Sequence, residues 1–146
     1  MTFPVRQHKE LQRRLRRVLE SLPGAEGYIV DMEFPYRPLP ENEVWGADVA
    51  CVSGTRYEAI EKWLEGSPEL VIEVKSPSNT QAEMYDKAMT TLAGAGAAEF
   101  WIVDPETRTV LVHRKASGMR IFGADEAVPL LMFDARIALS ELFAGL

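Results

Sequence analysis

The chain has 146 residues, 47% of them hydrophobic and 26% charged, and its formal net charge is −6. These values are typical of one globular domain that can bury its own core, and they exclude collagen-like and disordered chains. No apolar run approaches the roughly 20 residues that span a membrane, and the single cysteine, Cys51, excludes an internal disulfide, so we expect a cytoplasmic protein with no membrane partner.

The first element is predicted to be a basic amphipathic helix. Leu11, Leu15 and Leu22 recur at helical spacing, and the Pro23-Gly24 pair ends the pattern. Arginines stand between the leucines at Arg13, Arg14, Arg16 and Arg17. Residues 1–20 carry six basic and two acidic side chains, whereas the rest of the chain carries 10 basic and 20 acidic ones. A basic helix on an acidic body is either a local contact surface for nucleic-acid phosphates or a solvated face.

The rest of the chain alternates between strand and helix patterns. We expect a strand over 27–34, a proline-rich loop over 35–42, a strand over 47–53, a helix over 55–64, a strand over 69–75, a helix from an N-cap at 79 or 80 to about 93, a hairpin of strands over 99–104 and 109–114, a strand over 119–122 and a helix over 139–143. This order predicts a single α/β domain over residues 1–146, with a central mixed β-sheet flanked by helices.

Two carboxylates stand inside otherwise apolar strand patterns. Glu73 and Lys75 alternate onto one face of the strand over 69–75, about 7 Å apart along it. Asp48 is the only charged residue in the run 46–52. Each has a purely structural explanation, since a Glu–Lys pair suits a sheet edge and an aspartate at a strand end suits a turn. Together they also form the kind of site that Mg²⁺ prefers, with a few carboxylate oxygens and a lysine beside them.

The order of Asp48, Glu73 and Lys75 resembles the D…(D/E)-x-K core of the PD-(D/E)XK nuclease superfamily. Within that superfamily, the chain is similar to the Uma-type putative restriction endonuclease family. The blocks 68–78 (PELVIEVKSPS) and 100–105 (FWIVDP) are much more specific than the core signature. Residues 47–53 and 139–143 match in the family's order as well, so the resemblance covers nearly the whole chain.

The resemblance implies a restriction-endonuclease-like core, a Mg²⁺ or Mn²⁺ cofactor and hydrolysis of phosphodiester bonds in DNA. Carried over residue by residue, it makes Asp48 and Glu73 metal ligands and Lys75 the catalytic lysine. The acidic residue that relatives place on the first strand maps to Glu33, which is either a further metal ligand or a solvated strand end. Relatives often carry a lysine on the helix after the ExK strand, but Lys87 is one residue out of step. Either the segment 94–96 absorbs this shift, or the contribution of the helix is lost and Lys87 faces solvent, which is the favoured expectation.

Three other side chains are expected to be structural. His8 lies one helical turn before Leu11, so it should face the sheet, with a minor chance of touching the site. His113 is expected on the exposed surface of the hairpin, and Trp101 in the core.

Two hypotheses from different classes follow. The first is a metal-dependent DNA endonuclease in which Arg13, Arg14, Arg16 and Arg17 help to hold the nucleic-acid backbone. The second is a catalytically inactive nucleic-acid-binding or assembly module that retains the nuclease fold, because an acidic body repels DNA unless metal or a partner compensates. A homodimer that pairs two sites, one for each strand, is compatible with the first hypothesis.

Overall fold

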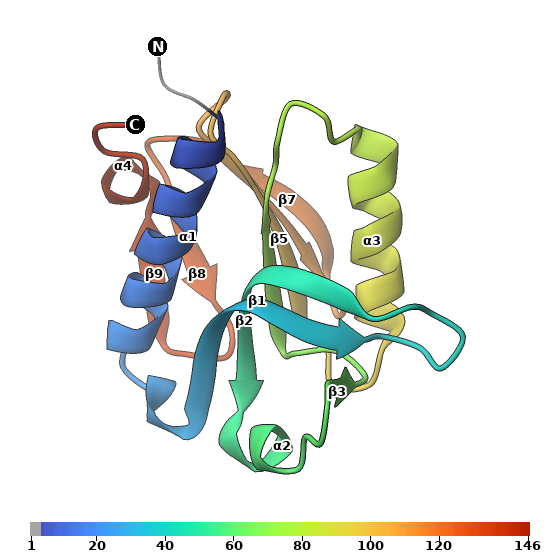
Figure 1. Ribbon diagram of the computed structural model, residues 1–146. Helices are drawn as coiled ribbons and strands as arrows, with labels where there is room; N and C mark the ends of the chain where they lie inside the picture. Colours follow the sequence, from blue (N-terminus) through green and yellow to red (C-terminus); the bar gives the residue numbers. More distant parts are fainter. Residues whose placement is uncertain (1–3) are drawn as a thin grey trace.

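The computed structural model describes residues 4–146 and has a mixed β-sheet between two helical layers (Figure 1). The elements are α1 (Pro4–Ser21), the 3-10 turn η1 (Ala25–Gly27), β1 (Tyr28–Arg37), β2 (Trp45–Ser53), α2 (Gly54–Glu58), β3 (Leu64–Glu65), β4 (Leu70–Val74), α3 (Gln81–Ala93), β5 (Glu99–Asp104), β6 (Thr109–Arg114), β7 (Gly118–Phe122), β8 (Ala127–Leu130), β9 (Ala135–Ala138) and α4 (Leu139–Leu142). Over this part of the chain the main sheet has seven strands in the order β3-β1-β2-β4-β5-β6-β7, and β8 and β9 form a separate hairpin. The predicted fold class is therefore confirmed.

The two faces of the sheet carry separate cores. On one face, Leu70, Ile72 and Val74 of β4 join a cluster with leucines of α1 and with residues of β8, β9 and α4. On the other face, Val71 packs with apolar residues of α3 and β5. The alternation predicted for β4 is thus present, and Glu73 has the same strand parity as Val71, toward α3.

The register of the sheet brings distant carboxylates to one place. β2 runs antiparallel to β4, with Val49 opposite Ile72, and β4 runs parallel to β5. One step beyond the last β2–β4 pair, Asp48 therefore comes opposite Glu73. This pairing positions the candidate site at the end of the ladder, where α1 and α3 reach the sheet from opposite sides.

Several sequence predictions are wrong in detail. The helix expected over 55–64 is only the short α2, after which the chain crosses to β3 and pairs in parallel with β1. The proline-rich loop begins later than expected, because β1 extends to Arg37 and Pro35 pairs with Gly46. The hairpin of β8 and β9 was not predicted. At β3, pairing with the distant strand β1 overrides the local pattern.

Two predictions about single side chains have opposite outcomes. Trp101 is fully buried, as expected. His113 is also buried, with 3% of its surface exposed, and the expectation that it lies on the surface is wrong. Its ring packs edge-on against Tyr85 of α3, so the helix covers a strand that the sequence pattern presents as half exposed.

Among the helices of residues 4–146, none is long and apolar enough to cross a membrane.

Candidate functional site

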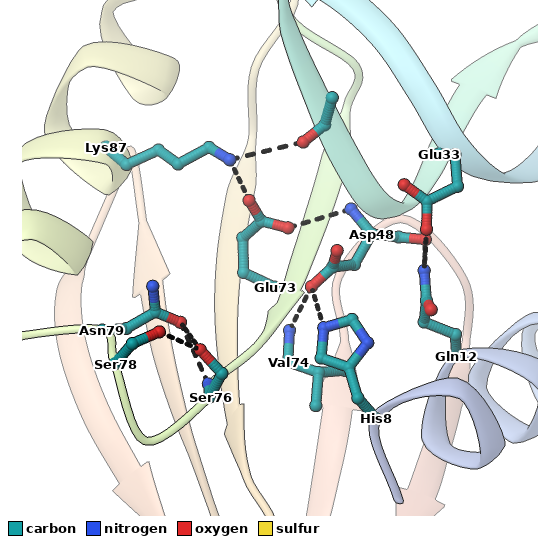
Figure 2. A network of polar contacts seen from close by, with 11 residues as sticks. His8, Gln12, Glu33, Asp48, Glu73, Val74, Ser76, Ser78, Asn79 and Lys87 are labelled. Carbon is teal, nitrogen blue, oxygen red and sulfur yellow. Dashed lines mark hydrogen bonds and ion pairs between the residues drawn. The ribbon is translucent and has the colours of Figure 1, made fainter. Parts of the chain in front are cut away.

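Asp48 and Glu73 hold together the end of the β2–β4 ladder through their side chains (Figure 2). The backbone N–H of Asp48 donates to Glu73 Oε2 at 2.9 Å, and the backbone N–H of Val74 donates to Asp48 Oδ2 at 2.8 Å. Each carboxylate thus accepts a backbone N–H from the other strand. The two predicted carboxylates are brought together, and their orientation is fixed by the sheet itself.

Two side chains of α1 contact Asp48. His8 Nε2 lies 3.1 Å from Asp48 Oδ2. Gln12, one helical turn later and almost fully buried, donates from Nε2 to the Asp48 carbonyl at 2.9 Å and to Glu33 Oε1 at 2.8 Å. His8 therefore contacts a candidate site residue, which the sequence suggested only as a minor chance. Gln12 was missed, and its spacing of four residues from His8 was the available signal.

Glu33 is an exposed residue whose carboxylate accepts a hydrogen bond from Gln12 (Figure 2). Its φ of 52° is left-handed, and it interrupts the β1–β2 ladder between the pairs Met32–Val49 and Phe34–Ala47. Such a backbone conformation costs about 1–3 kcal/mol for a residue with a side chain and is concentrated at functional sites. Gln12 connects the Glu33 carboxylate to the backbone of Asp48, which is the residue opposite it.

Lys87 is part of the site, and the expectation that it faces solvent is wrong. Its Nζ forms an ion pair with Glu73 Oε1, donates to the Gly46 carbonyl at 3.3 Å and lies 5.8 Å from the centre of the Trp45 ring. α3 begins at the N-cap Thr80, whose side chain accepts the N–H of Glu83. The helix then buries Met84 and Ala88, and Lys87 stands between them on the side toward β4.

Lys75 lies on the same face as Glu73 but lines a different cavity. Asp48, Glu73, His8 and Lys87 line a cleft of about 360 Å³. Lys75 is half-buried in the wall of a neighbouring cavity of about 670 Å³, between α3 and strands β5 to β7. Across residues 4–146, its ammonium group has no ion-pair partner. Glu73 already has a cation in Lys87, so Lys75 remains free to meet a ligand.

The pKa values of the two carboxyl groups are shifted in opposite directions by their surroundings. Burial and the nearby charge of Asp48 raise the pKa of Glu73 to about 7, although Lys87 opposes the shift. Burial would also raise the pKa of Asp48, but hydrogen bonds from His8 and the Val74 N–H outweigh it and lower that pKa. The hydrogen bond to Asp48 in turn raises the pKa of His8. Two crowded carboxyl groups of this kind are where a divalent cation is most stabilising.

The donor set fits a hard cation that keeps part of its water shell. Over residues 4–146, His, Cys, Asp and Glu side chains form no group of three or more that encloses a metal ion. Mg²⁺ does not need such a cage, since it is commonly held by one or two carboxylates with waters completing its octahedron. Asp48 and Glu73 supply two carboxylates, whereas the Glu33 carboxylate is bound to Gln12 and does not line the cleft.

The four arginines of α1 have different surroundings. Arg13 and Arg14 both pair with Glu10 at 3.3 Å, and Arg16 pairs with Glu20 at the same distance. Arg14 also donates to the carbonyl groups of Leu142 and Ala144, so it anchors the C-terminal segment. Arg13 and Arg17 are the exposed members of the set.

Comparisons with known proteins agree with this architecture. A solved structure described as a putative nuclease belonging to DUF820, from Anabaena variabilis, superposes with a TM-score of 0.79 at 21% identity, covering 94% of this chain and 80% of that one. The chain therefore shares the α/β fold of that protein. The family model of Uma2, described as putative restriction endonuclease, matches residues 1–144, and the chain belongs to that family. No curated protein matches this chain.

Proposed function

We propose that this protein is a metal-dependent endonuclease that hydrolyses phosphodiester bonds in DNA. The observation that carries the proposal is the reciprocal bonding of Asp48 and Glu73, which fixes two carboxyl groups side by side at the open end of a ladder. Buried carboxyl groups are costly unless they are hydrogen-bonded, paired or bound to a metal, and a bound cation would stabilise both groups. Membership in a family described as putative restriction endonuclease supports the same conclusion.

Asp48 and Glu73 are the proposed metal ligands, with Glu33 as an outer ligand. A bound Mg²⁺ or Mn²⁺ would polarise a phosphoryl oxygen and lower the pKa of a water molecule. His8 and Gln12 hold Asp48 from one side, and Lys87 holds Glu73 from the other, so these three act as positioning residues. Lys75 is the proposed catalytic lysine, because a free ammonium group beside the ligands can stabilise charge that develops on the phosphate.

Cleavage of supercoiled plasmid and of single-stranded DNA tests this assignment. With Mg²⁺ or Mn²⁺, wild type should nick DNA, and Glu73→Gln should abolish the reaction. Lys75→Ala should slow it by about 10²–10³-fold, the usual cost of removing one group that stabilises transition-state charge. Lys115→Ala, which removes an exposed lysine of the β6–β7 turn, is the matched control and should retain full activity.

The alternative is a nucleic-acid-binding or assembly module without catalysis. Activity that survives both Glu73→Gln and Lys75→Ala would contradict the proposed site. Wild-type protein that neither cleaves DNA nor binds metal would favour the non-catalytic module. The argument for this module is the net charge of −6, because an acidic protein repels DNA.

A homodimer would place one site against each strand of a duplex. Sedimentation that shows only monomer at micromolar concentration would remove that part of the proposal.

A further inference from the structure

The larger cavity begins where the carboxylate cleft ends. Met84 lines both, and Lys75 stands in the wall of the larger one, two residues after Glu73. Residues at this spacing on a strand are about 7 Å apart. A nucleic-acid chain with one phosphate at the carboxylates therefore passes Lys75 and meets the cavity within one nucleotide.

The cavity has the size and lining of a small-ligand site. Its volume of about 670 Å³ falls within the range of about 300–1,000 Å³ usual for such sites. Tyr85, Met119 and Ile121 contribute apolar surface and are each more than half exposed, at 53%, 59% and 60%. Asp104 adds a carboxylate to the wall, so apolar surface is combined with a hydrogen-bonding group.

His113 supplies a buried polar group in the same wall. Its Nε2 is buried and has no hydrogen-bond partner within the described part of the chain. Burial lowers the pKa of the ring, so the imidazole is neutral near pH 7. Tyr85 covers it edge-on, with ring centres 5.9 Å apart. A buried nitrogen without a partner is costly, and a ligand with a polar edge removes that cost.

We propose that this cavity receives one unpaired nucleobase of the nucleic acid whose phosphate lies at Asp48 and Glu73, so that the substrate class is single-stranded or locally unpaired DNA. The inference rests on the proposed function, because the carboxylates mark the position of the phosphate. The base stacks on Tyr85, Lys75 meets the intervening phosphate, and a small rotation of Tyr85 opens His113 to the edge of the base.

A base fits these groups better than an apolar protein segment does. The ammonium group of Lys75, which has no ion-pair partner within residues 4–146, is complementary to phosphate from the wall of the larger cavity. Apolar side chains would leave Lys75 and His113 unsatisfied. A base inside a duplex cannot enter without leaving its stack. Because the body of the protein is acidic, phosphate contacts alone are weak, and stacking adds affinity that does not depend on charge.

Fluorescence anisotropy in the presence of Ca²⁺ tests the proposal through binding. The probes are a labelled single-stranded oligonucleotide, its duplex, and an abasic strand of the same length and charge. Wild type should prefer the single strand to the other two. Tyr85→Ala should weaken single-strand binding by about fivefold to hundredfold, the usual loss when one stacking ring is removed, and should leave duplex binding unchanged. Tyr57→Ala, which removes a 39% exposed tyrosine outside the cavity, should change neither.

A second variant tests the hydrogen bond at the base edge. His113→Phe keeps a ring of similar volume without its nitrogens, and it should weaken single-strand binding about twofold to tenfold while leaving thermal unfolding close to wild type. Equal affinity of wild type for the abasic and the normal strand overturns the proposal, as does a Tyr85→Ala variant that binds like wild type. No measurable binding of any probe also overturns it.

The two proposals fail differently. If the nuclease assignment is wrong and the base cavity is real, Tyr85→Ala still loses single-strand binding, although wild type shows no cleavage that depends on Glu73. If the cavity proposal is wrong and the nuclease assignment is right, Glu73→Gln abolishes cleavage, but Tyr85→Ala binds all three probes as wild type does.

Discussion

The backbone N–H of Asp48 donates to the carboxylate of Glu73 at 2.9 Å, although the two residues belong to different strands and are 25 positions apart in sequence. The Val74 N–H returns the contact to Asp48 at 2.8 Å. The same atoms therefore end the ladder and form the candidate site. Substitutions here must be chosen to separate loss of chemistry from loss of structure, and amide replacements, which keep an accepting oxygen, are the suitable ones.

Metal binding should depend on both carboxylates. Calorimetric titration with Mn²⁺ should give binding heat for wild type and none for Asp48→Asn or Glu73→Gln, because each variant removes a negative charge from the proposed ligand pair. Glu61→Gln, an exposed carboxylate near β3, is the control and should bind like wild type. Wild-type heat that persists in both site variants would place the metal elsewhere.

The stability of the metal-free protein should carry a pH signature of Glu73. Its pKa in the folded state, about 7, lies above the ordinary value of 4.5, so protonation favours the folded state. This contribution is complete below pH 4.5 and is lost as the pH rises from 4.5 to 7. Over that interval, the free energy of unfolding of wild type should fall relative to that of Glu73→Gln, by a few kcal/mol at most.

Urea unfolding in EDTA at several pH values measures this difference. The raised pKa of His8 gives a pH dependence of the same sign, so the comparison with Glu73→Gln, which retains His8, is needed to isolate Glu73. Parallel stability curves for the two proteins would contradict the prediction.

Lys87 should stabilise the fold only while Glu73 lacks another cation. Lys87→Met leaves a carboxylate that is 8% exposed without its partner, and we expect a loss of about 3 kcal/mol in urea unfolding without metal. Lys87→Arg should retain most of the stability. Mg²⁺ should restore more stability to the methionine variant than it adds to wild type, because the metal takes over the charge of the lysine. A methionine variant as stable as wild type would contradict this role.

The exposed arginines of α1 should bind DNA through the charge of its phosphates. The double variant Arg13→Ala/Arg17→Ala should reduce the slope of log K against log salt by up to about two, since each phosphate contact contributes about 0.9 for duplex DNA. Arg14 is left unchanged, because it anchors the carbonyl groups of the C-terminal segment. Lys62→Ala is the control. An unchanged slope in the double variant would make the basic face of α1 a solvated surface.

Local patterns in the sequence determined most of the elements and the faces of the central strand. The alternation in β4 assigned Leu70 and Ile72 to one core and Val71 to the other, because successive side chains on a strand point to opposite faces. The N-cap of α3 and the hairpin of β5 and β6 were predicted for similar reasons, since capping and turn chemistry act over a few residues. The predictions failed at β3, a two-residue strand that depends on the distant strand β1, and at the β8–β9 hairpin, whose two strands have only four residues each.

The candidate site likewise combines residues that the sequence predicts with contacts that only the tertiary structure shows. Asp48, Glu73 and Lys75 stand out in the sequence, because a charge within an apolar strand is costly unless it is paired, hydrogen-bonded or bound to a metal. Only the tertiary structure decided that His8 and Gln12 contact Asp48, that Lys87 rather than Lys75 pairs with Glu73, and that Lys75 lines the neighbouring cavity. The physical reason is that these contacts depend on how α1 and α3 dock on the sheet and on where the β2–β4 ladder ends. Both are set by packing between segments far apart in the chain, which no local pattern encodes.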